Sequence, residues 1–180
     1  MNRNLSYLIR GIALLVASTY ASADTVYITA ETIYTAGKRG VISNGTVLVR
    51  DGKIRAVYDH QNSKPPEGAR IFEVATLTPG FIDTRTTDGL SGIYNTGADQ
   101  DQDETTDANM AGLRALDSYN PREPLLNVVR AYGVTTIQAT PGDKTPIAGQ
   151  AAVLKTWGDT VEEAKLVGSS AMVFNLGETV

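Results

Sequence analysis

Acidic side chains are concentrated in one short segment of the chain. Residues 99–107 read Asp-Gln-Asp-Gln-Asp-Glu-Thr-Thr-Asp and place five carboxylates within nine positions. An EF-hand loop also begins with carboxylates at alternate positions, but its sixth residue is glycine and its twelfth a bidentate glutamate. Here those positions hold Glu104 and Met110, so calcium binding is disfavoured. We interpret the segment as a solvated acidic loop, with substrate contact as the alternative.

Histidine and cysteine, the usual ligands of catalytic zinc, are almost absent. The chain has one histidine, His60, and no cysteine. Disulfides, thiolate metal sites and thiol redox chemistry are thereby excluded, and the two or three imidazoles of a typical zinc hydrolase are missing. His60 follows Asp59 in a predicted turn and is interpreted as a surface residue. Residues 141–146, Pro-Gly-Asp-Lys-Thr-Pro, lack the spacing of a phosphate-binding loop.

The overall composition is that of a globular protein with no basic surface. The 180 residues are 42% hydrophobic and 20% charged, and 16 basic against 20 acidic side chains give a net charge of −4. A net negative field repels nucleic acid and anionic lipid, so neither is an expected partner. The length fits one domain or slightly more.

The first 23 residues have the order of features found in a secretory signal peptide. Arg3 and Arg10 precede a short apolar run, residues 11–17, and Ala21-Ser22-Ala23 forms a small-residue cleavage pattern. The apolar run is far shorter than the roughly 20 residues that span a bilayer. We therefore predict an exported protein, periplasmic or secreted, with no membrane attachment after cleavage; a buried N-terminal helix is the alternative.

The elements that must position any site fall into two groups. Between residues 24 and 78, short β-branched runs alternate with turn signals, of which Asn44-Gly45 and Asp51-Gly52 are typical of two-residue hairpins. This pattern predicts a small antiparallel, β-sandwich-like module. Its predicted strands are residues 26–30, 32–35, 45–50, 53–58 and 71–74.

After Pro79 the hydrophobic period changes, and strands alternate with helical segments. Helices are predicted at residues 121–132 and 161–167, and strands at 134–140, 151–156 and 171–176. Such alternation indicates an α/β fold with parallel βα units. Residues 84–180 are far fewer than the about 250 of a closed (β/α)₈ barrel. We expect the first βα units of an incomplete TIM-like barrel in a truncated chain that aggregates or forms oligomers, or else a small complete α/β domain.

Two motifs carry a resemblance to a known family. Residues 51–57, Asp-Gly-Lys-Ile-Arg-Ala-Val, are followed by Leu-Thr-Pro-Gly-Phe-Ile-Asp at residues 77–83. This pair resembles the amidohydrolase superfamily, specifically its imidazolonepropionase-like branch, and extends over the N-terminal portion of such an enzyme. Further similar segments are residues 113–121, 133–136, 141–142 and 147–156. The resemblance implies that residues 79–180 form a partial amidohydrolase barrel and that the parent activity is metal-dependent hydrolysis of a non-peptide C–N bond, in an amide or cyclic imide.

The metal-binding motif of that family is degenerate here. In the family, Pro-Gly-Phe-Ile-Asp leads into His-x-His, and those imidazoles bind a divalent metal such as zinc; this chain has Arg85 and Thr87 at the two positions. A guanidinium has no free lone pair, and a threonine hydroxyl is a weak zinc ligand. The resemblance therefore implies no metal in this chain and no assignable catalytic residue. Lys155, a candidate for the family's carboxylated lysine, is interpreted as facing solvent.

Two interpretations of the missing His-x-His motif remain open. In one, the full-length protein keeps a single metal on later strands, and Arg85 holds an anionic group of the substrate. In the other, the protein is a pseudoenzyme. The sequence thus predicts an exported amidohydrolase-family protein that is inactive as this chain alone, or a non-catalytic exported module that binds a ligand or a partner.

Overall fold

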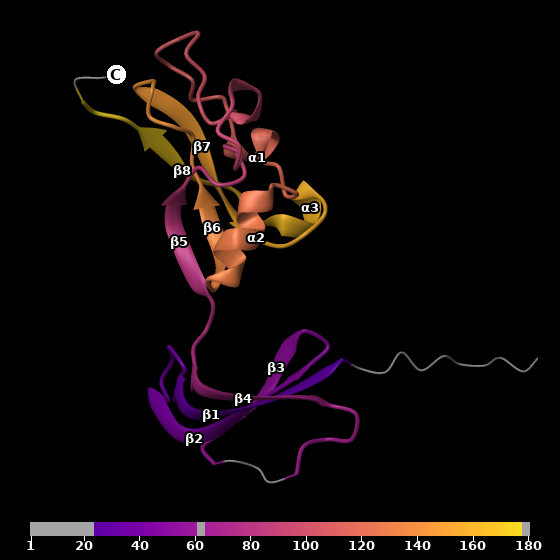
Figure 1. The fold of residues 1–180 in the computed structure, drawn as a ribbon. Coiled ribbons are helices and arrows are strands. Elements are labelled where there is room, and N and C mark those ends of the chain that lie inside the picture. Colours follow the sequence, from indigo (N-terminus) through magenta and orange to yellow (C-terminus); the bar gives the residue numbers. More distant parts are fainter. Residues whose placement is uncertain (1–23, 61–63, 178–180) are drawn as a thin grey trace, which may run out of the picture. The chain divides into compact units, whose positions relative to one another are not determined.

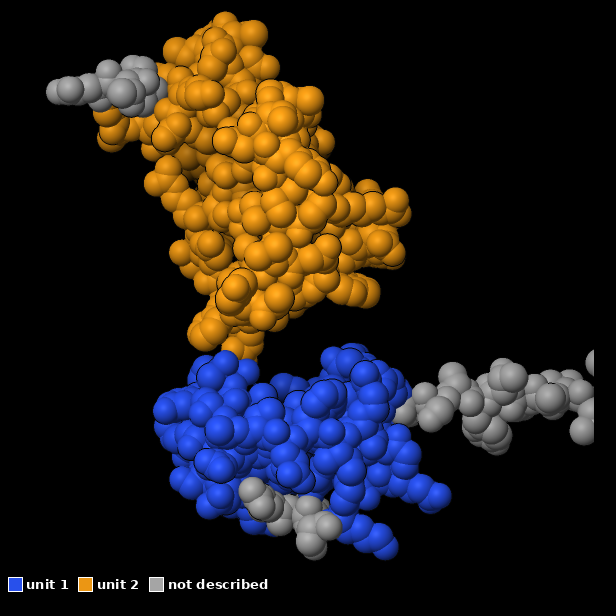
Figure 2. Space-filling model, in the orientation of Figure 1, with its two compact units in different colours: residues 1–78 blue, residues 79–180 orange. Residues whose placement is uncertain are grey.

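A computed structural model describes residues 24–60 and 64–177, which fall into two compact units (Figures 1 and 2). The first unit ends at Thr78 and the second begins at Pro79. The predicted signal peptide, residues 1–23, lies outside the described residues. Among the helices that are described, none has the length and apolar character needed to cross a membrane.

The first unit is one mixed sheet of four strands in the order β3-β2-β1-β4. Its strands are β1 (Thr25–Tyr34), β2 (Val41–Arg50), β3 (Lys53–Tyr58) and β4 (Arg70–Leu77). β1, β2 and β3 pair antiparallel, but β4 runs parallel to β1, so the prediction of an antiparallel module is wrong for this strand. β4 follows residues 59–69 instead of a two-residue turn, and no hairpin fixes its direction.

The two predicted hairpin turns of this unit behave differently. Asp51 and Gly52 have φ angles of 53° and 68° and join paired residues Arg50 and Lys53, which confirms that turn. The turn predicted at Asn44-Gly45 is wrong, because both residues lie inside β2. A Cβ on Gly45 would lie 2.7 Å from the Ile33 side chain, so this glycine is required for close packing rather than for chain reversal.

The second unit contains another mixed sheet, in the order β5-β6-β7-β8. Its strands are β5 (Phe81–Thr86), β6 (Val134–Ala139), β7 (Ile147–Lys155) and β8 (Lys165–Phe174). Only β5 and β6 are parallel; β6-β7 and β7-β8 are antiparallel, which corrects the prediction of parallel βα units throughout. The connections at 140–146 and 156–164 are too short for a crossover helix. The fold is therefore α/β with two small mixed sheets.

Helices cover one side of the β5-β6-β7-β8 sheet (Figure 1). The main one, α2 (Pro124–Ala131), confirms the predicted helix and ends before Gly133, whose φ is 93°. Buried Leu126 packs with Ile137 and Leu154 in the core of this unit. The predicted helix at 161–167 is one turn only, because β8 begins at Lys165. The other short helices are η1 (Gly97–Asp99), α1 (Ala115–Ser118) and α3 (Val161–Ala164).

Candidate functional site

Arg85 lies near the carboxyl end of β5, an edge strand of the second sheet. The register with β6 shifts between Asp83 and Thr86, where β5 has one residue more than its partner. Such a bulge changes the direction in which local side chains point. The Asp83 carboxylate accepts a hydrogen bond from the Arg85 backbone N–H at 3.0 Å and fixes this irregular segment. Arg85 is exposed and lines two cavities, one of about 420 Å³ and one of about 250 Å³.

The larger cavity, called the Arg85 cavity below, is formed by three segments that are distant in the sequence. They are the end of β5, part of the acidic loop, and residues 140–143 after β6. In α/β sheets, ligands bind outside the carboxyl ends of parallel strands, and β5 and β6 are the parallel pair here. The cavity is lined by Arg85, Thr86, Thr87, Gln102, Asp103, Thr140, Pro141, Gly142 and Asp143.

The loop after β6 is held from both sides. The Gly142 N–H donates to the Gln102 carbonyl at 2.7 Å, and the buried Asn175 amide donates to the Gly142 carbonyl at 3.0 Å. A Cβ on Gly142 would lie 2.2 Å from Asp103 Oδ1, so only glycine allows the acidic loop to approach this closely. The Lys144 N–H donates to the same oxygen at 3.3 Å. This wall of the cavity is therefore fixed in the folded chain.

The charges that line the Arg85 cavity are only partly paired. Asp103 lies 3.3 Å from Lys144 Nζ, and its side chain is only 13% exposed. Within residues 24–60 and 64–177, Arg85 has no carboxylate at ion-pair distance, and Asp143 has no cationic partner. The cavity thus offers one guanidinium and one carboxylate that are free to meet a ligand.

Thr87, at the second position of the degenerate motif, takes part in a turn. Its hydroxyl lies 2.9 Å from Ser91 Oγ, and its carbonyl accepts hydrogen bonds from the Ser91 N–H and the Ser91 hydroxyl. Burial raises the pKa of the neighbouring Asp88 carboxyl above its ordinary value. In the part of the chain that the structure describes, no three Asp, Glu or His side chains come together as metal ligands. By their own chemistry, a protonated guanidinium and a neutral hydroxyl, Arg85 and Thr87 do not fit a divalent metal ion.

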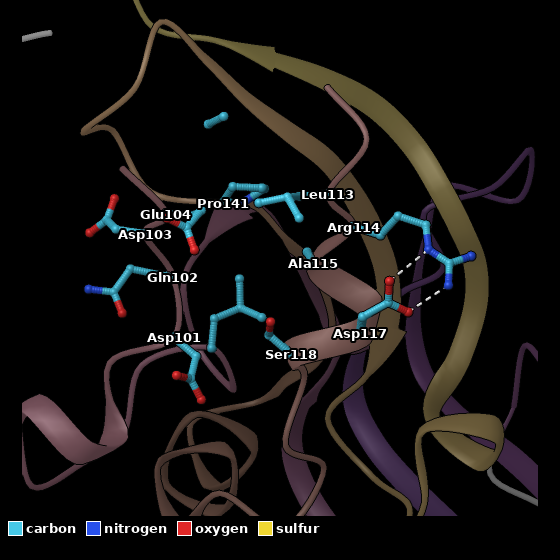
Figure 3. A pocket seen from close by; sticks show the side chains of 12 residues that line it. Asp101, Gln102, Asp103, Glu104, Leu113, Arg114, Ala115, Asp117, Ser118 and Pro141 are labelled. Carbon is cyan, nitrogen blue, oxygen red and sulfur yellow. Dashed lines mark hydrogen bonds and ion pairs between the residues drawn. The ribbon is translucent and has the colours of Figure 1, made fainter. Parts of the chain in front are cut away.

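Most carboxylates of the acidic loop are engaged with the loop itself. Asp99, Glu104 and Asp107 accept hydrogen bonds from nearby backbone N–H groups. The Thr106 N–H lowers the pKa of Glu104, as expected when a hydrogen bond favours the charged form. Figure 3 shows a neighbouring cavity of about 230 Å³ on this loop, where Asp117 is paired with Arg114. Among the five carboxylates, only that of Asp103 lines the Arg85 cavity.

Comparison with known proteins bears on the family. No family model matches the chain. The chain is 31% identical over 114 residues to the amidohydrolase tasK of Hapsidospora irregularis, covering 62% of this chain and 12% of that protein. The crystal structure of an amidohydrolase from Thermotoga maritima MSB8 matches with a TM-score of 0.71 and 28% identity, covering 84% of this chain and 39% of that one. These similarities support the amidohydrolase superfamily.

Two other sequence candidates, His60 and Lys155, are not among the residues that line the Arg85 cavity. Exposed His60 belongs to the first unit, where its Nδ1 lies 3.1 Å from Asp59 Oδ1. Exposed Lys155 pairs with Thr136 at the start of β6, whereas Arg85 lies beside the end of that strand. Lys155 and Arg85 therefore lie beside opposite ends of β6.

Sequence reasoning did not identify residues 141–143 as a cavity wall, because it considered residues 141–142 only as a segment similar to the family and residues 141–146 as a rejected phosphate loop. Their position directly after the strand at 134–140 was the available signal, because such loops line the active face of βα barrels. The contact of Gly142 with Asp103 joins residues far apart in the chain, and no local sequence pattern predicts it.

Proposed function

We propose that this chain is the N-terminal part of a longer, exported amidohydrolase of the imidazolonepropionase-like branch. The motifs at residues 51–57 and 77–83 support the branch, and the leader pattern at 1–23 supports export. The chain spans 12% and 39% of the lengths of two proteins that it matches, which supports the proposal of an incomplete barrel. The parent reaction is hydrolysis of a non-peptide C–N bond in a small amide or cyclic imide.

Within this protein, the proposed role of the chain is to hold an anionic group of the substrate. The observation that carries the proposal is the guanidinium of Arg85, which lines a cavity at the carboxyl ends of β5 and β6 without a carboxylate partner among the described residues. Guanidinium binds carboxylate through two parallel charge-assisted hydrogen bonds. Arg85 would therefore position a substrate carboxylate rather than a metal ion.

The chain is proposed not to catalyse turnover by itself. A divalent metal such as zinc, which would supply Lewis-acid chemistry, requires donors other than Arg85 and Thr87. A specific observation also favours a second function, a non-catalytic exported module that binds a ligand or a partner. The Thr87 hydroxyl is engaged with Ser91, and the wall at Gly142 is hydrogen-bonded to the acidic loop, which supports a cavity formed by the chain's own contacts.

Titration of the 180-residue chain with simple carboxylates, propionate to hexanoate, tests the anion site. Backbone amide NMR shifts at Thr86 and Gly142 report binding. We expect Arg85→Gln to weaken binding at least about tenfold, since charged hydrogen bonds contribute about 1.5–3 kcal/mol. Arg122→Gln, an exposed arginine that lines a different cavity, is the matched control and should bind like the parent. Equal affinity in Arg85→Gln and the parent would refute the site.

Hydrolysis and metal content distinguish the two functions. The chain should release no product from amide or cyclic imide probes and should contain less than stoichiometric zinc by elemental analysis. Turnover by the chain itself would contradict the proposal. Hydrolysis by a longer natural polypeptide that contains these residues would favour the amidohydrolase, and carboxylate binding without hydrolysis by that polypeptide would favour the binding module.

A further inference from the structure

The Arg85 cavity contains two opposite charges that do not neutralise each other. Arg85 comes from β5 and Asp143 from the loop after β6, and both are exposed side chains. Among the described residues, neither has an ion-pair partner. The third charged residue that lines the cavity, Asp103, is already paired with Lys144 at 3.3 Å. What remains for a ligand is therefore one positive and one negative group in the same space.

The backbone that carries these two charges is hydrogen-bonded on each side of the cavity. On one side of the cavity, the Asp83 carboxylate holds the Arg85 N–H. On the other, Gly142 and Lys144 flank Asp143, and their N–H groups donate to the Gln102 carbonyl and to Asp103 Oδ1. Because the backbone positions are set before binding, only the two side chains have to be ordered when a ligand binds, which reduces the entropy lost.

Three hydroxyl groups of the cavity wall are already engaged, whereas the buried Gln102 Oε1 has no hydrogen-bond partner among the described residues and is a further acceptor for a ligand ammonium group. The Thr86 hydroxyl accepts from the Asp88 N–H at 3.1 Å, and the Thr140 hydroxyl donates to the Thr86 carbonyl at 3.3 Å. The Thr87 hydroxyl is occupied by Ser91. The two unpaired charges are consequently the strongest recognition groups left. Of these, the Asp143 carboxylate would repel a dianion such as a phosphate ester.

We propose that the Arg85 cavity binds a zwitterionic aminocarboxylate, with its carboxylate on Arg85 and its ammonium group on Asp143. This inference rests on the proposed anion site and specifies the substrate class, namely amides built on a small molecule that carries both a carboxylate and a basic amine. A cavity of about 420 Å³ has the size of a small-molecule site.

The test compares ω-amino acids, from β-alanine to 6-aminohexanoate, with the unsubstituted carboxylates of equal chain length. Each pair differs only by the ammonium group. We expect at least one amino acid to bind at least about tenfold tighter than its partner, and Asp143→Asn to remove this difference while carboxylate binding persists. Asp101→Asn, the same charge change in the neighbouring cavity, is the control and should preserve the difference.

The outcomes separate this inference from the function on which it rests. If every amino acid binds no tighter than its unsubstituted partner, yet binding still depends on Arg85, the zwitterion proposal is wrong and the anion site stands. If no ligand binds in an Arg85-dependent manner, both are wrong. An ammonium preference that survives Asp143→Asn would also overturn the assignment of Asp143.

Discussion

Substitution of Gly142 by alanine should test how the cavity wall is built. An added Cβ would lie 2.2 Å from Asp103 Oδ1, and the shortest relief is rotation of the Asp103 carboxylate. That rotation removes two contacts with Lys144, the N–H hydrogen bond and the ion pair, each 3.3 Å long. One hydrogen bond and one partly exposed ion pair together contribute about 1–2 kcal/mol. Gly142→Ala is expected to reduce the free energy of unfolding of the second unit by that amount.

A double-mutant cycle tests whether Gly142→Ala acts through Asp103. Asp103→Ala loses the same contacts with Lys144, so adding Gly142→Ala to it should cost close to nothing, and the two substitutions should be strongly non-additive. Urea unfolding followed by Trp157, the only tryptophan of the chain, reports the second unit. Gly112→Ala is the control, because a Cβ there meets nothing within 4 Å. Additive costs in the double variant, or no cost for Gly142→Ala, would show that the contact is not as described.

Two further predictions concern the scaffold of the second unit. Burial, with a smaller effect of Asp88, raises the pKa of Tyr119 to about 12. This folded-state pKa exceeds the unfolded value of about 10. The stability contributed by the protonated phenol is therefore present below pH 10 and is lost as the pH rises toward 12. Tyr119→Phe should flatten this alkaline decline in pH-dependent unfolding, and an unchanged slope would refute it. Glu123, which is 8% exposed, caps α2 and accepts hydrogen bonds from the N–H groups of Leu125 and Ile93. Glu123→Ala should therefore lower the free energy of unfolding by about 1–2 kcal/mol. A loss near zero would argue against the cap.

The sequence predicted those parts of the fold that depend on neighbouring residues. Asp51-Gly52 forms its turn because both positive φ angles are local properties of the dipeptide. Asn44-Gly45 carries the same signal but lies within β2, where the approach of Ile33, not chain reversal, requires the glycine. Likewise, the directions of β4, β7 and β8 depend on which strands meet across the sheet, and the hydrophobic period carries no information on that.

In the candidate site, too, one residue could be predicted from the sequence and another depends on tertiary contacts. Arg85 could be found from the sequence because a guanidinium stands where the similar family has a metal ligand, and the structure places it at a cavity. Asp143 could not, since its relevance follows from the contact of Gly142 with Asp103 and from the lack of an ion-pair partner of Asp143 among the described residues. Such pairings over long separations are set by tertiary packing.

The acidic loop shows why a count of charges does not describe a site. Its five carboxylates would give a strongly negative cavity if all faced one ligand. Asp99, Glu104 and Asp107 are instead bound to backbone N–H groups, Asp103 is bound to Lys144, and Asp101 lines the neighbouring cavity. The unpaired charges in the Arg85 cavity are therefore one guanidinium and the Asp143 carboxylate from another segment. A balanced pair of this kind favours a ligand that is itself zwitterionic over one that carries a negative charge alone.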